Sequence, residues 1–201
     1  MIAIVDYDAG NIKSVEKALQ FLSEEPVVTR DKELLMKADK VIVPGVGAYG
    51  DAMGKMTQHG LVDVLREIAA KGTPILGICL GLQLFFDSSE ECDGVKGLSL
   101  LPGKIVRIPD KEGFKIPHMG WNSIRINPES RLFQGIEDGS YVYFVHSYYL
   151  QAEREEDVAA TTDYVVNIHA AAERDNVFAT QFHPEKSGEI GLRILKNFIE
   201  L

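Results

Sequence analysis

The sequence contains little cysteine, and this scarcity limits the kinds of protein it can be. Cys79 and Cys92 are the only cysteines among 201 residues. Two cysteines cannot build the dense disulfide framework of a small secreted domain. The segment from Met1 to Asp6 has neither the basic region nor the cleavage site of a secretory signal. We therefore expect a cytoplasmic protein.

Long apolar runs and an excess of positive charge are also missing. No apolar run approaches the roughly 20 residues of a membrane-spanning helix, because Gly, Asp or Lys interrupts each one. The 30 Asp and Glu residues outnumber the 21 Lys and Arg residues, which gives a formal net charge of −9. A surface of that sign does not attract nucleic acids or anionic membranes. Small molecules and proteins remain as the expected partners.

The first half of the chain alternates β-branched runs with amphipathic stretches. This alternation predicts a parallel sheet covered by helices. The expected strands are Ile2 to Val5, Val27 to Thr29, Val41 to Val43 and Ile75 to Ile78. The expected helices are Asn11 to Leu22, with Asn11 as its N-cap, and a helical region from Asp51 to Ala70.

The second half has a different pattern. Between Leu98 and Thr180, short β-rich pieces alternate with Gly, Asp, Asn and Pro, which predicts antiparallel strands and hairpins. Examples of these pieces are Lys104 to Ile108, Tyr141 to Val145 and Val158 to Thr161. A final helix from Gly188 to Ile199 has one apolar face. With 45% hydrophobic residues and no repeat, we predict one α/β domain over residues 1–201, with helices on both faces of a mixed, mostly parallel sheet.

Cys79 lies where a strand turns sharply into a helix. The segment Gly77 to Gly81 closes one apolar run and opens the apolar helical stretch from Leu82 to Phe86. Glycines two residues before and after a nucleophile leave room for a strained backbone that projects the side chain above the sheet edge. The free amides of the following helix favour a thiolate. We predict that Cys79 is a nucleophile; a buried, unreactive cysteine is the plainer alternative.

A histidine and a carboxylate follow the strand-like run from Val177 to Phe182. In the sequence His183-Pro184-Glu185, period-two geometry at a strand end points the imidazole and the carboxylate the same way. A cysteine nucleophile needs a base to hold its proton and an acid to fix the tautomer of that base. We therefore predict Cys79, His183 and Glu185 as a catalytic set.

The other histidines and the second cysteine lack such a context. We expect each of these histidines to be a surface or core residue, and we expect no metal site because no paired ligand spacing occurs. Cys92 has acidic neighbours that oppose thiolate formation, so we expect it to be a bystander. The histidines concerned are His59, His118, His146 and His169.

The segment from Gly45 to Gly50 matches the G-x-G-x-x-G pattern of dinucleotide-binding proteins. That pattern belongs after the first strand of its unit, whereas here it follows the third expected strand and Pro44, and Cys79 replaces the expected acid. A tight glycine turn without chemistry is a second interpretation. The interpretation we favour is that Gly45, Val46 and Gly47 offer backbone amides to an oxyanion beside Cys79.

The β-branched side chain of Val46 matters for that interpretation, because such residues resist positive φ. The amide can therefore rest turned away, so that a ligand or partner has to flip the Gly45–Val46 peptide.

Taken together, the Pro44 to Gly47, Gly77 to Gln83 and His183 to Glu185 segments resemble the class I (triad) glutamine amidotransferase family, and the resemblance covers essentially the whole chain. Three further segments are similar to the glutaminase subunits of imidazole glycerol phosphate synthase within that family. They are Asp6 to Asn11, Pro117 to Asn122 and Val145 to Tyr148.

The resemblance implies a three-layer amidotransferase fold and the release of ammonia from glutamine by Cys79, His183 and Glu185, without a cofactor. It implies a heterodimer in which ammonia passes to a (β/α)8-barrel cyclase of histidine biosynthesis. The implied glutamine-binding residues, besides Gly45, Val46 and Gly47, are Leu80, Gln83, Ser147 and Tyr148. The implied residues of the partner interface or ammonia channel are Asn11, Ser14, Met119, Trp121 and Asn122.

Several plainer or rival interpretations stay open at this point. Gln83 can be an exposed helix residue, and Trp121 can be a core tryptophan. The chain can be a stand-alone cysteine hydrolase or peptidase, an inactive assembly subunit, or a glutaminase that serves another synthase, for example one in purine or pyridoxal phosphate synthesis. Asp8 also differs from the glycine that many family members have there, which bears on a loop facing the partner.

Overall fold

Five parallel strands form the first part of the central sheet. The computed structural model describes all of residues 1–201, and its eleven-stranded sheet has the path β2-β1-β3-β4-β13-β12-β10-β6-β5. From β2 to β13 every neighbouring pair is parallel. The parallel strands are β1 (Ile2–Val5), β2 (Val27–Thr29), β3 (Lys40–Val43), β4 (Ile75–Ile78) and β13 (Val177–Thr180).

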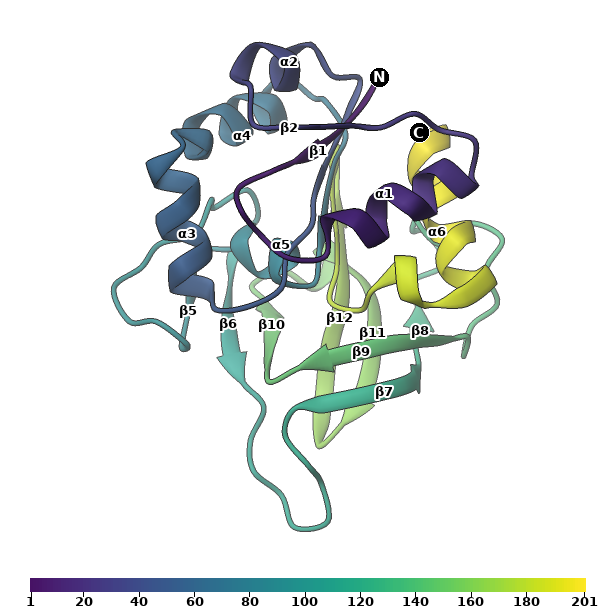
Figure 1. The fold of residues 1–201 in the computed structure, drawn as a ribbon. Coiled ribbons are helices and arrows are strands. Elements are labelled where there is room, and N and C mark those ends of the chain that lie inside the picture. The colour runs from purple at the N-terminus through teal and green to yellow at the C-terminus, as the bar shows by residue number, and fades with distance from the viewer.

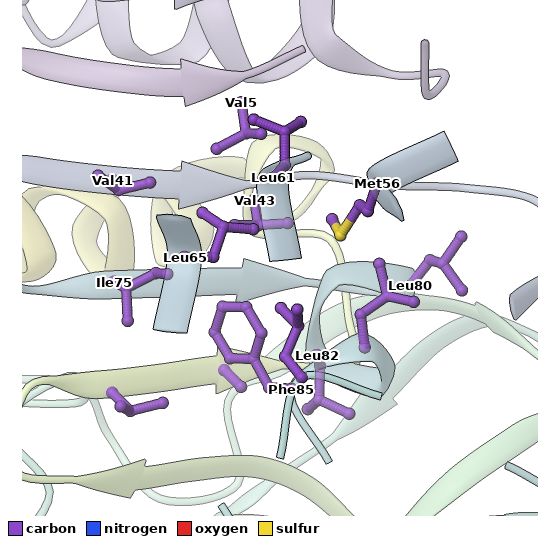
Figure 2. Packing of buried hydrophobic residues seen from close by; sticks show 14 of the residues in the cluster. Val5, Val41, Val43, Met56, Leu61, Leu65, Ile75, Leu80, Leu82 and Phe85 are labelled. Carbon is purple, nitrogen blue, oxygen red and sulfur yellow. The ribbon is translucent and has the colours of Figure 1, made fainter. Parts of the chain in front are cut away.

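Alternate residues of these strands supply two separate cores. Ala3 and Val5 of β1 belong to a cluster of 28 buried residues beneath one set of helices, whereas Ile2 and Ile4 belong to a cluster of 23 on the other face. Because side chains alternate along a strand, a run of apolar residues packs against helices on both faces. Figure 2 shows the first cluster, where Val43 lies among Leu61 and Leu65.

The helices cover the two faces of this sheet (Figure 1). On one face lie α3 (Tyr49–Gln58), α4 (Leu61–Ala70) and the short α5 (Leu80–Leu84), with α2 (Lys32–Lys37) packed on α4. On the other face lie α1 (Ile12–Phe21) and α6 (Gly188–Glu200). None of these helices is both long and apolar enough to cross a membrane.

The remaining strands form the antiparallel part of the molecule. Within the sheet, β12 (Val166–Arg174) pairs antiparallel with β13, β10 (Tyr148–Ala152) and β11 (Val158–Tyr164). Three further strands complete it, namely β5 (Ser88–Ser89), β6 (Gly103–Arg107) and β8 (Arg125–Ile126). β7 (His118–Ser123) and β9 (Tyr141–His146) form a separate antiparallel pair, here called the β7–β9 ribbon, which runs across the other strands in Figure 1.

The predicted layered α/β architecture is confirmed, with local corrections. The helical region from Asp51 to Ala70 is two helices, because Gly60 adopts φ 62° between them. The helix α2 was not predicted, and β5 pairs parallel to β6. β13 ends at Thr180, before a 3₁₀ turn η2 (Pro184–Lys186), and a second 3₁₀ turn η1 spans Glu155–Asp157.

Asn11 gives a further correction. It stands at the N-cap position of α1, but its φ is 75° and its side chain makes no capping hydrogen bond. The prediction of a side-chain cap is therefore wrong. A tertiary contact, described below, takes the amide instead.

Candidate active site

Cys79 occupies the sharp turn between β4 and α5. Its φ of 56° and ψ of −105° place a non-glycine residue in a strained region of backbone space. The Cys79 N–H donates to the Thr180 carbonyl at 2.7 Å, which anchors the turn to β13. A Cβ on Gly81 would lie 1.9 Å from the Val43 carbonyl oxygen, and one on Gly77 would lie 2.6 Å from the Gly81 carbonyl. The flanking glycines are therefore required by close backbone contact.

His183 and Glu185 pair with each other close to this turn. His183 Nδ1 lies 2.7 Å from Glu185 Oε1, and both side chains are fully buried. The carboxylate can only accept, so Nδ1 carries the hydrogen. The two residues do not continue β13 as the period-two argument assumed, because Glu185 lies in the 3₁₀ turn η2. The 3₁₀ turn nevertheless brings the imidazole of His183 and the carboxylate of Glu185 into contact.

The environment of His183 favours its charged form. Burial lowers the pKa of His183, but interactions with Cys79 and with Glu185 outweigh burial and raise the pKa to about 9. Nε2 itself is buried without a hydrogen bond of normal distance and angle, so Cys79 acts on the ring through proximity and charge. An imidazole of this kind keeps its proton at neutral pH beside Cys79.

Two amide side chains that the sequence analysis did not place here support these groups. Asn11 Nδ2 donates to Glu185 Oε1 at 2.6 Å, across 174 positions of sequence. Gln181 is fully buried, and its Nε2 lies 3.9 Å from Cys79 Sγ. Asn11 had been expected only at the partner interface, and Gln181 not at all. No local pattern signals contacts of this range.

A pocket of about 360 Å³ opens above Cys79. Cys79 is only 6% exposed and lies at this pocket, so it is both buried and reachable. Six of the predicted binding residues line it, whereas Gly45 does not. The lining residues besides Cys79 are Val46, Gly47, Leu80, Gln83, Ser147 and Tyr148, with Glu91, Pro117, Val145 and His146.

Gln83 is a buried residue of this pocket, which excludes its interpretation as an exposed helix residue. Its Nε2 donates both hydrogens, to the Tyr148 carbonyl and to Gln181 Oε1, at 3.2 Å each. Gln83 Oε1 is therefore the atom that this side chain can offer to a ligand.

The loop after β3 lies beside the turn of Cys79, because β3 and β4 are neighbours. The Leu80 N–H donates to the Gly45 carbonyl at 3.3 Å. The carbonyl and N–H of one peptide point in opposite directions, so the Val46 N–H points away from Leu80. The two amides thus do not converge on one point in this conformation.

Tyr7 anchors the loop that follows β3. Its hydroxyl donates to the Pro44 carbonyl at 2.7 Å, and a Cβ on Gly45 would lie 2.2 Å from the same hydroxyl oxygen. Burial, with the nearby Cys79, raises the pKa of Tyr7 above its usual range, so the hydroxyl remains a donor. Tyr7 belongs to the Asp6 to Asn11 segment of the resemblance, but this role was not predicted for it.

The predicted interface residues lie on two parts of the surface near the pocket. Met119 and Trp121 on β7 are 63% and 56% exposed, so the interpretation of Trp121 as a core residue is wrong. Asn122 is half-buried and donates to the Asp163 carbonyl at 3.0 Å. Ser14 lies on the first turn of α1, near Asn11. No group of three or more His, Cys, Asp or Glu side chains is arranged to hold a metal ion.

Comparison with known proteins agrees with this geometry. The family Glutamine amidotransferase class-I matches residues 3–201. The chain belongs to the class I glutamine amidotransferase family. The resemblance stated from the sequence is therefore confirmed, and the nucleotide-binding interpretation of the Gly45 to Gly50 segment is not needed.

Curated relatives in this amidotransferase family are similar over nearly the full length. A protein of Bacillus cereus (strain G9842) named imidazole glycerol phosphate synthase subunit HisH is 52% identical over 198 residues, which cover 98% of this chain and 93% of that protein. A protein of the same name from Moorella thermoacetica is 52% identical over 200 residues, which cover 100% of this chain and 94% of the relative.

Solved structures share the fold at much lower identity. A crystal structure described as a glutamine amidotransferase has a TM-score of 0.78 at 19% identity and covers 100% of this chain and 98% of its own. The structure of PurLQS from Thermotoga maritima has a TM-score of 0.74 at 22% identity, with coverage of 99% and 97%. These likenesses confirm the single-domain α/β amidotransferase fold.

Proposed function

We propose that the chain is the glutaminase subunit of imidazole glycerol phosphate synthase, a cytoplasmic enzyme of histidine biosynthesis. The observation that carries this proposal is the buried His183–Glu185 pair beside a strained cysteine at the base of a pocket. The full-length similarity to relatives with the HisH name supports the choice of synthase. Both cysteines are free thiols, which fits a reducing compartment.

The chemistry begins with attack of the Cys79 thiolate on the side-chain amide carbon of glutamine. His183 then gives its proton to the nitrogen, the C–N bond breaks, ammonia leaves, and a γ-glutamyl thioester remains on Cys79. His183 next takes a proton from water, and the resulting hydroxide attacks the thioester. Glutamate leaves and the thiolate is restored. Glu185 keeps the hydrogen of His183 on Nδ1 throughout, which leaves Nε2 for these transfers.

The oxyanion of each tetrahedral intermediate needs N–H donors near Cys79. The Leu80 N–H is one candidate, but it is occupied by the Gly45 carbonyl. A flip of the Gly45–Val46 peptide would free the Leu80 N–H and turn the Val46 N–H to the same side. In this conformation neither N–H is available to the oxyanion, and we infer that a bound partner triggers the flip.

The exposed face of the β7–β9 ribbon fits a protein partner. Met119, Trp121 and Tyr141 are large apolar residues that are each more than half exposed there. Exposed aromatic and methionine side chains are typical of interface centres. We propose that a (β/α)8-barrel cyclase covers this face and receives the ammonia. A stand-alone hydrolase or peptidase would not need such a face, and the intact triad argues against an inactive subunit.

Trapping of the thioester tests this function. The chain is mixed with glutamine and the barrel cyclase with its ribulosyl ligand, quenched in acid, and analysed by mass spectrometry of peptides. We expect a γ-glutamyl adduct on the peptide of Cys79, none on that of Cys92, and none in Cys79→Ser. The absence of an adduct on Cys79, with glutamine consumed, would reject the mechanism.

A further inference from the structure

The β7–β9 ribbon contains two buried histidines that the proposed mechanism does not use. His118 and His146 are 3% and 5% exposed and occupy paired positions of the two strands. His118 Nδ1 lies 3.0 Å from His146 Nε2. The His118 ring is stacked between Phe144 and Tyr164, with centroid distances of 4.8 Å and 4.0 Å. Each ring is therefore fixed in position.

The hydrogen-bond partners determine the tautomer of each ring. His146 Nδ1 lies 2.9 Å from the Tyr148 carbonyl oxygen, which can only accept, so Nδ1 carries the hydrogen. The Nε2 of a neutral ring is then an acceptor, and His118 Nδ1 must donate to it. The Nε2 of His118 in turn accepts from Asn122 Nδ2, which lies 3.3 Å away.

The Asn122 amide is oriented independently of the histidines. Its Oδ1 accepts from the Ser123 N–H at 2.9 Å, and its Nδ2 also donates to the Asp163 carbonyl at 3.0 Å. The donor therefore faces His118, and every hydrogen bond from Asn122 to Tyr148 has the same direction. A charged ring would place two N–H groups opposite each other, and burial lowers the pKa of His118 to about 4 and of His146 to about 3.

The chain of hydrogen bonds ends in the glutamine pocket. The Tyr148 carbonyl accepts from His146 and from Gln83, so both of its lone pairs are used and its peptide is fixed. His146, Ser147 and Tyr148 all line the pocket. The same histidine pair thus connects the wall of the pocket to β7, the strand whose other face exposes Met119 and Trp121.

We propose that His118 and His146 are positioning residues for glutamine, which act by holding the Tyr148 carbonyl and Gln83 in place and by tying this wall to the β7–β9 ribbon. The proposal rests on the proposed function, because it takes the ligand of the pocket to be glutamine. It assigns the histidines no proton transfer.

Two substitutions of His146 separate the two ends of its ring. The amide of His146→Asn can place a donor near the original Nδ1 and keep the bond to Tyr148, whereas His146→Gln reaches the original Nε2 and loses that bond. With the barrel and its ligand present, we expect His146→Gln to raise KM for glutamine about fivefold, as expected for one lost hydrogen bond. We expect His146→Asn to restore KM to within about twofold, and kcat to change little in both.

Equal KM values in the two variants, or a loss confined to kcat, would overturn the proposal. Thermal unfolding of both variants shows whether a fall in stability accompanies the change, and a purely structural role predicts equal damage in both. A wild-type enzyme that consumes no glutamine would reject the proposed function, and with it glutamine as the ligand.

A second measurement needs neither activity nor a variant. Nitrogen-15 NMR of histidine-labelled wild-type chain reports the tautomer of each ring. We expect His118 and His146 both to be neutral with the hydrogen on Nδ1 at pH 7, which is the less common tautomer of a free imidazole. Hydrogen on Nε2 of either ring, or a charged ring, would overturn the hydrogen-bond direction on which the proposal depends.

Discussion

Two regions of the molecule place buried histidines beside the same pocket, one charged and the other neutral. At the end of β13, His183 faces the Glu185 carboxylate and Cys79, and its pKa rises to about 9. In the β7–β9 ribbon, His146 faces a second imidazole and a carbonyl, and burial lowers its pKa to about 3. Burial opposes the charge of both rings, so the neighbouring groups decide the outcome. The first histidine is suited to proton transfer and the second to fixed hydrogen bonding.

The same two regions differ in what they show to solvent. The His183–Glu185 pair is fully buried, and burial strengthens the electrostatic interaction between its two charges. The ribbon has a buried inner face, which carries His118 and His146, and an outer face that exposes Trp121. We expect the first region to determine the rate of the chemical step and the second to determine glutamine and partner binding.

The largest expected effect comes from removing the Glu185 carboxylate, which contacts His183 but not the histidines of the ribbon. Glu185→Gln keeps the shape of the side chain but offers His183 an amide. We expect kcat for glutamine hydrolysis to fall about 10²- to 10⁴-fold, because the ring loses its fixed tautomer and the support for its charge. Steady-state assays of the complex measure this. A fall of less than tenfold, with the variant folded, would contradict the role of Glu185.

The next effect acts on the ribbon and leaves the buried pair intact. Trp121→Ala removes an exposed aromatic side chain, and we expect affinity for the barrel to fall about 30-fold, as at an interface hot spot. Calorimetric titration measures the Kd. Phe21→Ala is the matched control, since Phe21 is 76% exposed but lies at the far end of α1. Equal losses in the two variants would contradict a specific interface at Trp121.

A smaller effect should increase activity. In Val46→Gly, positive φ carries no penalty, so the Gly45–Val46 peptide can flip without a partner. We expect glutamate release by the chain alone to rise about fivefold, and the stimulation by the barrel to shrink by a similar factor. Unchanged basal activity would show that Val46 is not what keeps the loop at rest.

The raised pKa of His183 also predicts a pH dependence of stability. A group whose pKa is higher in the folded state contributes stability that is complete below its unfolded value near 6.5 and is lost as pH rises to about 9. Glu185→Gln removes one cause of the rise. Between pH 6.5 and 9, the free energy of unfolding should therefore fall less in this variant than in wild type. Urea unfolding at both pH values measures this, and equal falls would contradict the charge on His183.

The smallest expected effect is at the second thiol. Cys92→Ala should leave kcat and KM within about twofold of wild type, because Cys92 is half-buried beside Gly50 of α3 and makes no hydrogen bond with His183 or Glu185. Assays of the complex, beside Cys79→Ser, measure the contrast. A large loss of kcat in Cys92→Ala would contradict the prediction that Cys92 takes no part in the reaction.

Local patterns were enough to predict some parts of the site. The glycines around Cys79 are required by backbone contacts within the turn and the adjacent strand, so their spacing alone indicated the elbow. The His183–Glu185 contact was predicted, although by a strand geometry that the 3₁₀ turn replaces. These features depend on residues that are close in sequence.

Contacts between distant residues were not accessible in this way. Asn11 fits the N-cap preference of its position, yet its amide donates to Glu185, which lies near the other end of the sequence. His118 and His146 looked like ordinary core histidines, because their pairing exists only when β7 and β9 come together. Tyr7 lies in the Asp6 to Asn11 segment, but no local pattern indicated its hydrogen bond to Pro44, which lies at the end of a different strand.

Glutamate release in three mixtures tests the central claim most directly. The chain is assayed alone, with the barrel cyclase, and with the barrel and its ribulosyl ligand, with Cys79→Ser as the blank. A partner-gated glutaminase predicts little release from the chain alone and strong release only in the full mixture. Full activity of the chain alone would contradict the gating and favour a free hydrolase, and no activity in any mixture would contradict the assignment as a glutaminase.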